Sequence, residues 1–401
     1  MTKKILYINP CFVRTAHTTL QTHLFPNHPQ VNYLGRFVKN LYIMNRLSSQ
    51  QKKIVEQSDP FCEEFFENII LLDNEIYDQK YNEIVKTAEK IYLDPYKTNI
   101  FSHDMFTLYS FHHTTPVNAA PTHLKGKKYF GSNKMNPSSS IQNLKIDENS
   151  IKSSVLKSTF SRTVSRINSI FNKINVDVYY FFNIRNQSEL IPSWYESTSK
   201  ELGRSGSFNM EELTQYLKGQ NSDNLLIKRL LDGFKFSEYQ NTINNIVGKD
   251  KVKVFLFEKF REDSSNYISD LSNYLRIDPT ISKKMLKNKK EQVNYYDIRQ
   301  SSVINLPLSL IYFKFIKNFK DPKNLLNNFT GKVINLCSLL FKNVFKISYK
   351  DKEIIKIKKD NFIKQSNLIK NNLPMIKEFY KEDSLALKKE LGPDIDKYNY
   401  L

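Results

Sequence analysis

Cysteines are scarce in this sequence and follow no pairing pattern. The 401 residues include three of them, Cys11, Cys62 and Cys337, which are far apart, form no CxxC pair and are odd in number. Disulfide frameworks and structural zinc sites are built from cysteines at closer, paired spacings. The sequence therefore indicates neither kind of site. It favours a reducing compartment, and we expect a cytoplasmic protein.

Long apolar segments are lacking as well. The first residues, MTKKILYINP, have no apolar core or small-residue cleavage site, so we expect no signal peptide. The apolar-basic stretches within 303–348 are each shorter than the roughly 20 apolar residues that a spanning helix needs. We expect no transmembrane helix in this region. Core or lid helices and an amphipathic helix on a membrane surface both stay open.

Acidic residues are outnumbered by basic ones. The chain has 60 Lys and Arg against 41 Asp and Glu, a formal net charge of +19. Such an excess favours an anionic partner, whether a nucleotide, nucleic acid, polyanionic glycan or acidic membrane surface, and does not choose among them. Because 40% of the residues are hydrophobic and 13% aromatic, most of the chain should fold, as one large α/β domain or two smaller ones.

Strand-like apolar runs alternate with helical patterns along the chain. We expect strands at 4–8, 31–34, 98–102, 177–184 and 251–257, and helices at 16–26, 36–56, 61–72, 75–94, 158–173, 210–248 and 264–276. The run at 177–184, DVYYFFNI, is unbroken, which is typical of a strand buried on both faces of a parallel sheet. The alternation predicts an α/β fold with a mainly parallel sheet.

The segment KILYINPCFVRTAHTTLQ, residues 4–21, joins the first expected strand to the first expected helix. Its loop carries a cation and several small or hydroxyl residues: Arg14, Thr15, Ala16, His17, Thr18 and Thr19. A turn of this kind can bind a phosphate, because the free N–H groups and the positive end of the helix dipole both face the anion. The alternative is an ordinary connection in which Thr18 or Thr19 caps the helix.

A second segment, RNQSELIPSWY, follows the buried strand at 177–184. Arg185 stands at the carboxyl end of that strand, and Ser193 comes eight residues later, about two helical turns on. Doubly wound sheets bind ligands outside the carboxyl ends of their strands, where an Arg fork and a hydroxyl could grip a second phosphate. The alternative is a surface ion pair between Arg185 and Glu189.

Together, the two segments resemble the family of PAPS-dependent sulfotransferases, whose sulfate donor is 3′-phosphoadenosine 5′-phosphosulfate (PAPS). The family's first motif is approximately K-T-G-T-T-T-L-Q, and this chain has RTAHTTLQ at 14–21. The second motif is an Arg with a Ser eight residues on, and the surrounding RNQSELIPSWY is similar to bacterial, carbohydrate-modifying members. Fainter similarities lie in NHPQVNYLGR, in VFLFEKF with Glu258, and in the last residues of the chain.

The resemblance implies a P-loop-type three-layer sandwich, a central sheet flanked by helices, as a single sulfotransferase-like domain over 1–401. Outside the similar regions, 112–157 would be a polar insertion or lid, and 280–370 a basic, apolar helical region. The resemblance also implies a reaction, transfer of a sulfuryl group from PAPS to a hydroxyl of a surface polysaccharide or glycolipid, without metal or nucleic acid. If the stretches within 303–348 form an amphipathic surface helix, the protein would also make a peripheral contact with the inner face of the membrane.

Site roles follow from the same resemblance. The loop from Arg14 to Thr19 would hold the 5′-phosphosulfate, and Arg185 with Ser193 would hold the 3′-phosphate. Arg14 replaces the family's Lys on the bridging oxygen and keeps the charge, but it cannot release a proton. Ala16 replaces a Gly, which is unfavourable if that position needs a positive φ. His17 replaces a Thr and could donate to a phosphate or sulfate oxygen.

The catalytic base has two candidates after the expected strand at 98–102. Asp104 would be a shortened equivalent of the carboxylate in the S-x-E pattern of carbohydrate-modifying members, and His103 titrates in a suitable range. Each could instead be a structural or capping residue. His112, His113 and His123 lie in the polar insertion and form no convergent ligand set, so we expect no metal site.

Three other functions stay open. A P-loop kinase would carry GxxxxGK[ST], which the sequence lacks. A non-enzymatic binder of nucleic acid or acidic membrane would use the net charge, but it leaves the spacing of Arg185 and Ser193 unexplained. A degenerate sulfotransferase that binds nucleotide without turnover would explain Arg14 and Ala16 at the positions of Lys and Gly.

Overall fold

The computed structural model describes residues 3–12, 14–35, 62, 65–66, 69–70, 72, 74–103, 106, 160–198, 210–218, 231–287, 367 and 371–401. The chain divides into two units. The first comprises 1–194, 207–290 and 371–401 and contains nearly all the described residues; the second comprises 195–206 and 291–370. The expected insertion at 112–157 and most of 280–370 lie outside the described residues, and a single domain over 1–401 stays a prediction.

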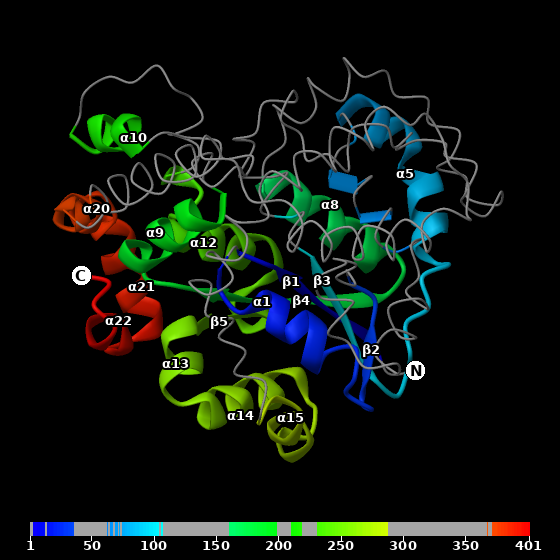
Figure 1. Ribbon diagram of the computed structural model, residues 1–401. Helices are drawn as coiled ribbons and strands as arrows, with labels where there is room; N and C mark the ends of the chain where they lie inside the picture. Colours follow the sequence, from blue (N-terminus) through cyan, green and yellow to red (C-terminus); the bar gives the residue numbers. More distant parts are fainter. Residues whose placement is uncertain are drawn as a thin grey trace, which may run out of the picture. The chain divides into compact units, whose positions relative to one another are not determined.

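The first unit is built on a five-stranded sheet in which every pair of neighbours is parallel. Its strands are β1 (Lys4–Pro10), β2 (Val31–Tyr33), β3 (Thr98–His103), β4 (Val176–Ile184) and β5 (Val252–Leu256). Their order in the sheet is β2-β3-β1-β4-β5, so β1 lies in the middle (Figure 1). The expected α/β fold with a parallel sheet is confirmed.

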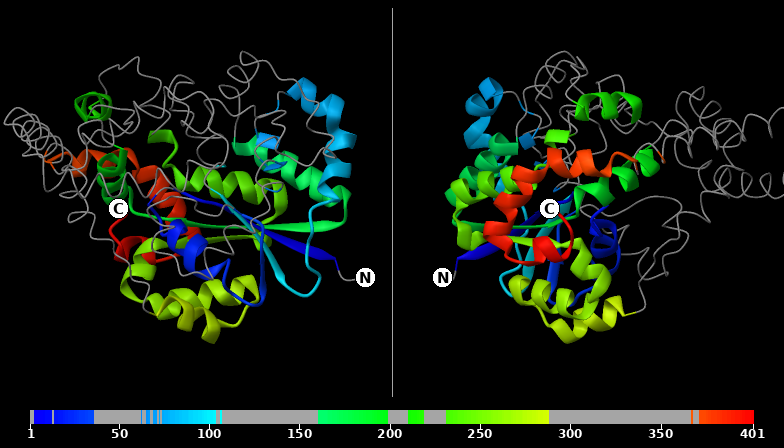
Figure 2. Two further views of the ribbon diagram at one scale, coloured as in Figure 1. Left: turned by 45° about the vertical axis from the view of Figure 1, so that its right-hand side comes forward. Right: turned by 90° about the vertical axis from the view of Figure 1, so that its left-hand side faces the viewer.

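Helices cover both faces of this sheet. The bounds of those closest to it are η1 (Leu20–Leu24), α8 (Phe160–Lys173), α12 (Phe236–Val247), α14 (Ser264–Leu275) and α15 (Pro279–Leu286). Helices α8 and α12 lie on one face, and η1, α14 and α15 lie on the other (Figures 1 and 2). The three-layer sandwich implied by the resemblance is therefore the observed arrangement.

Other helices of the described residues lie farther from the sheet or at its ends. They are α1 (His17–Thr19), α5 (Asn74–Ala88), α9 (Gln187–Thr198), α10 (Met210–Leu217), η5 (Lys249–Lys251), α13 (Phe257–Glu262), α20 (Leu373–Phe379), α21 (Lys381–Leu391) and α22 (Asp394–Lys397). The last residues of α9 belong to the second unit.

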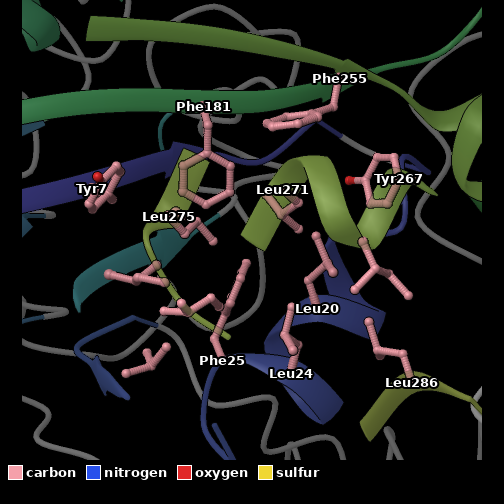
Figure 3. Close-up of a cluster of buried hydrophobic side chains, with 14 residues drawn as sticks. Tyr7, Leu20, Leu24, Phe25, Phe181, Phe255, Tyr267, Leu271, Leu275 and Leu286 are labelled. Carbon is pink, nitrogen blue, oxygen red and sulfur yellow. The ribbon is translucent and has the colours of Figure 1, made fainter. Parts of the chain in front are cut away.

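Strand β4 shows why the core forms on both sides. Because successive strand residues point to opposite faces, Phe181 joins the cluster under α14, while Phe182 packs on Phe12 with ring centroids 5.4 Å apart. The first cluster also holds Leu20, Leu24 and Leu271, all fully buried (Figure 3). Full burial of one such side chain stabilises the fold by about 1.5–3 kcal/mol. The unbroken apolar run of β4 therefore contributes side chains to the hydrophobic cores on both faces of the sheet.

Strands β1 and β4 are neighbours whose following helices leave toward opposite faces. The chain after β1 enters α1 and η1 on the α14 side, and the chain after β4 enters α9, which lies near α12 (Figure 1). In open α/β sheets such a reversal leaves a crevice outside the carboxyl ends of the two strands, where ligands bind. The topology thus brings Arg14–Ala16, after β1, and Arg185–Asn186, after β4, to the same end of the sheet.

Three helical expectations differ in detail from the structure. The helix expected at 16–26 is a single α-helical turn followed by π-helix at Leu20–Leu24, in which Phe25 N donates to Leu20 O at 2.9 Å. The helix expected at 75–94 ends at Ala88, and the range 210–248 is not one helix, because α10 ends at Leu217 and α12 begins at Phe236. The helix at 36–56 lies outside the described residues. Short π segments inside helices are frequent at functional sites.

Candidate functional site

The loop after β1 has an unusual backbone. Arg14 (φ 62°) and Ala16 (φ 66°) are both left-handed, a conformation that costs a residue with a side chain roughly 1–2 kcal/mol. Left-handed residues are a feature of concave anion-binding loops, in which successive backbone N–H groups point to one side. The question about Ala16 is therefore settled: this position has a positive φ, and Gly would fit it better.

Helix α1 begins at His17, with Ala16 as its N-cap. The cap residue makes no side-chain hydrogen bond to the helix. Thr18 and Thr19 lie inside α1, so the alternative in which either of them caps the helix is wrong. The backbone N–H groups at this helix start are thus not satisfied by a side chain of the N-cap.

Strand β4 and helix α14 hold the loop in this shape. Asn183 Nδ2 donates to the carbonyl of Thr15 at 2.9 Å, and the hydroxyl of Tyr267 donates to Asn183 Oδ1 at 2.6 Å. The hydroxyl of Thr15 donates to Phe12 O at 2.8 Å and is buried. The side chain of Thr15 therefore serves the loop itself rather than the crevice.

The two motif segments meet at Arg14. Its Nε donates to Ser193 Oγ at 3.0 Å, although the two residues are 179 positions apart. Arg185 Nη1 makes a long contact of 3.5 Å with the carbonyl of Arg14. The structure thus brings together Arg14, Arg185 and Ser193, and it places the Ser193 hydroxyl on Arg14, where the resemblance had paired it with Arg185.

Arg185 is largely buried, and the charges of Glu189, Glu258 and Arg14 all act on it. Its side chain is 15% exposed and stacks over Phe257 at 4.8 Å. Burial lowers the pKa of Arg185, the partner Glu189 at 3.1 Å raises it, and the charge of Arg14 lowers it again. Among the described residues, Arg185 Nε has no hydrogen-bond partner. Two nearby guanidinium groups with a spare buried donor favour an anion.

The expected ion pair between Arg185 and Glu189 is present, but it is not a simple surface pair. Glu189 also binds Arg261, whose Nη1 lies 2.8 Å from its Oε2. Burial alone would raise the pKa of Glu189, yet Arg261 and Arg185 together hold it below its ordinary value. Because one carboxylate is shared by two arginines, Arg185 keeps positive charge available for a ligand.

Of the two candidate bases, the structure describes His103 but not Asp104. His103 is the last residue of β3, is 3% exposed, and stacks on Phe101 with ring centroids 6.2 Å apart. Asp104 lies outside the described residues. His17, half-buried at the start of α1, belongs to the loop after β1. None of these contacts assigns the base, which stays a prediction.

A buried polar cluster under the first loop links β1, β3 and η1. Gln21 Nε2 donates to Ser102 Oγ at 3.1 Å and to Cys11 Sγ at 3.2 Å, and those two atoms are 3.1 Å apart. Ser102, the Ser of the S-x-E pattern, is thus engaged inside the protein. The cluster fixes the end of β3 against η1, the helix that follows the loop after β1.

Sequence reasoning missed Asn183 as a residue of the site. A lone amide in the apolar run DVYYFFNI was the available signal, because buried polar side chains are almost always hydrogen-bonded. Glu258 had been noted only as part of a motif. Its carboxylate is buried and accepts from the backbone N of Asn186 at 2.9 Å. The local sequence does not specify which distant group a buried amide or carboxylate will hydrogen-bond.

Comparisons with known proteins found one similar solved structure. No protein-family model matches the chain, and no curated protein matches it. The chain is similar to the crystal structure of a sulfotransferase from Alicyclobacillus acidocaldarius, with 9% identity and a TM-score of 0.34. The match covers 70% of this chain and 83% of that one. This likeness is weak, and the proposals below rest on the residues and contacts already given.

Two further properties concern the described part of the chain. Within it, no helix is both long and apolar enough to cross a membrane. Among the same residues, no group of three or more His, Cys, Asp or Glu side chains could hold a metal ion.

Proposed function

We propose that the chain is a sulfotransferase that moves a sulfuryl group from PAPS to a hydroxyl of a carbohydrate acceptor. The observation that carries the proposal is the contact between Arg14 and Ser193 at the carboxyl ends of β1 and β4. It joins the two segments that resemble the family's nucleotide motifs, in the crevice where a parallel sheet binds ligands. Two arginines in that crevice suit a nucleotide with two separate anionic groups.

The residues present fit such a donor. The loop N–H groups around Ala16, together with Arg14, would hold the 5′ side, and Arg185 would hold the 3′-phosphate with its spare donors. When bound, PAPS supplies a sulfuryl group activated by its phosphate leaving group. By analogy with phosphoryl transfer, the protein's contribution is mainly positioning and electrostatic stabilisation.

Arg14 and a base would have separate tasks. The permanent charge of Arg14 can stabilise negative charge that develops on the leaving oxygen, but the residue cannot deliver a proton. A group near the acceptor hydroxyl would take its proton, and the candidates are His103 and Asp104, while His17 would donate to a phosphate or sulfate oxygen. The carbohydrate or glycolipid acceptor is inferred from the similarity of RNQSELIPSWY to carbohydrate-modifying members.

Binding of the product nucleotide tests the proposal most directly. Calorimetric titration with 3′-phosphoadenosine 5′-phosphate (PAP) should show binding that does not require magnesium, and Arg185→Ala should weaken it strongly. Labelled sulfate from PAPS should then appear in cell-envelope glycans. Absence of PAP binding by the wild type would exclude the proposal. Magnesium-dependent binding of ATP in its place would favour a kinase.

A second candidate is a degenerate sulfotransferase that binds nucleotide without turnover. It is favoured by Arg14, because the side chain at the position of the family's Lys is engaged with Ser193. It is also favoured by the left-handed Ala16 in place of Gly. PAP binding with no transfer to any glycan pool would support this candidate, and transfer that appears in Arg14→Lys would identify the residue responsible.

A further inference from the structure

Asn186 connects Arg185 to helix α9. Its side-chain oxygen accepts a hydrogen bond from the backbone N of Ser188 at 2.8 Å, and its carbonyl accepts from Leu190 N at 2.8 Å. An Asn in this role fixes the first turn of a helix. Because Arg185 is the residue immediately before it, the direction of the Arg185 side chain depends on how Asn186 is held.

Contacts from two distant parts of the chain hold Asn186, which is 4% exposed. Its backbone N donates to Oε1 of Glu258, in the first turn of α13, at 2.9 Å. Its Nδ2 donates to the carbonyls of Tyr398 at 2.9 Å and Asn399 at 2.7 Å. Both the helix after β5 and the last residues of the chain therefore meet at this one residue.

Glu258 and Tyr400 close the arrangement. Glu258 is 1% exposed, and its Oε2 accepts from the hydroxyl of Tyr400 at 3.0 Å. Tyr400 is itself 2% exposed and is fixed through its carbonyl, which accepts from Ser384 Oγ at 3.0 Å. Burying a carboxylate among neutral donors is costly, and burial raises the pKa of Glu258. The cost is understandable if the position of the Asn186 N–H matters.

We infer that Glu258, acting through Asn186 and together with Tyr400, is a positioning residue that aims Arg185 at the 3′-phosphate of the nucleotide. The C-terminal residues 398–400 are then part of the nucleotide site although none of them needs to touch the ligand. The inference rests on the proposed function for the identity of the anion. The hydrogen-bonded network itself does not depend on it.

Two nucleotides separate positioning from general stability. PAP carries the 3′-phosphate, whereas AMP lacks it and would use only the loop after β1. Tyr400→Phe removes one hydroxyl, and Glu258→Ala removes the acceptor of Asn186 N. In both variants the affinity for PAP should fall about tenfold, the equivalent of one lost charge-assisted hydrogen bond, with the affinity for AMP unchanged. Glu258→Gln retains an acceptor oxygen and should recover part of the loss.

Glu262→Ala is the matched control. Glu262 also lies on α13 and also holds the chain's end, through the hydroxyl of Tyr398 at 2.6 Å and Lys397 at 2.7 Å, but its side chain is 54% exposed. Among the described residues, Glu262 makes no hydrogen bond to Asn186, whose backbone N is bound by Glu258 instead. This variant should bind PAP and AMP like the wild type. A loss in it equal to that in Tyr400→Phe would overturn the inference.

The remaining outcomes are also decisive. Equal losses for PAP and AMP, or wild-type affinity in both Tyr400→Phe and Glu258→Ala, would overturn the positioning role and leave the proposed function standing. If the wild type binds neither nucleotide, the proposed function is wrong, and inorganic sulfate becomes the probe. Sulfate binding that weakens about tenfold in Tyr400→Phe but not in Glu262→Ala would still support the role of the network, and equal binding would overturn it.

Discussion

The two halves of the proposed nucleotide site are held in different ways. The loop after β1 has two left-handed residues, Arg14 and Ala16, and is fixed at Thr15 by the amide of Asn183. The segment after β4 has a regular helix start, and its anchors, Glu258 and the chain's end, come from far along the sequence. The backbone of the loop after β1 is strained locally, whereas the segment after β4 depends on contacts with distant parts of the sequence. Substitutions should therefore affect them differently.

The largest effect is expected from Asn183→Leu, which tests whether β4 holds the first loop. The change leaves the carbonyl of Thr15 and the hydroxyl of Tyr267 without this partner in the interior, at roughly 1–3 kcal/mol each. Urea denaturation should show a loss of about 4 kcal/mol. Tyr267→Phe should lower the free energy of unfolding less in the Asn183→Leu variant than it does in the wild type, because the hydrogen bond between the two side chains is already lost. A loss below about 1 kcal/mol would mean that the loop is held elsewhere.

The second expected effect concerns Asp383, which ties α9 to α12. It accepts hydrogen bonds from Gln187 Nε2 at 3.1 Å and from the backbone N of Ser237 at 2.8 Å. Burial, with a smaller contribution from the charge of Glu238, raises the pKa of Asp383 from 3.8 to about 6. The folded state thus binds a proton more tightly than the unfolded state does. This contribution to stability is present below about pH 4 and is lost as the pH rises toward 6.

Its size follows from about 1.4 kcal/mol per pKa unit, so the contribution should change by about 3 kcal/mol over that window. Asp383→Asn does not titrate and should lack this part of the pH dependence. Urea unfolding of both proteins between pH 4 and 7 measures the difference, in which the titration of other groups cancels. If the free energies of unfolding of the wild type and Asp383→Asn change in parallel with pH, the pKa of Asp383 is the same in the folded and unfolded states and the prediction is wrong.

Arg185→Ala should weaken PAP binding about 100-fold, or about 2.7 kcal/mol, because the variant loses the charge on the 3′ side. Lys249→Ala is a charge-matched control, since its side chain is 72% exposed and pairs with Glu390 on the surface. It should change the affinity by less than about twofold at 0.15 M salt. Calorimetry that finds similar losses in both variants would point to diffuse attraction by net charge.

The smallest effect is expected from Ala16→Gly, which relieves strain in the first loop. Because Gly adopts a positive φ readily, the variant should gain about 1 kcal/mol of stability. Ala386→Gly is the matched control inside α21 and should lose about 1 kcal/mol. Thermal unfolding of the two variants should therefore shift in opposite directions. Shifts of the same sign would contradict the role of the backbone at Ala16.

The sequence predicted the fold well because the fold depends on patterns of local origin. All five strands were expected within two residues of their observed bounds. The helix at 16–26 was less well predicted, since a π segment depends on packing and not on hydrophobic period. The capping role for Thr18 or Thr19 was wrong because Ala16, with its left-handed backbone, takes the N-cap position.

The sequence by itself determined the alternation of strands and helices, the doubly buried β4, and the two segments suited to anions. These properties depend on side-chain period and on residue types a few positions apart. Only the tertiary structure decided that Arg14 meets Ser193, that Asn183 fixes Thr15, and that the last residues of the chain reach Asn186. Contacts between residues more than 160 positions apart depend on strand order and helix packing, which no local pattern specifies.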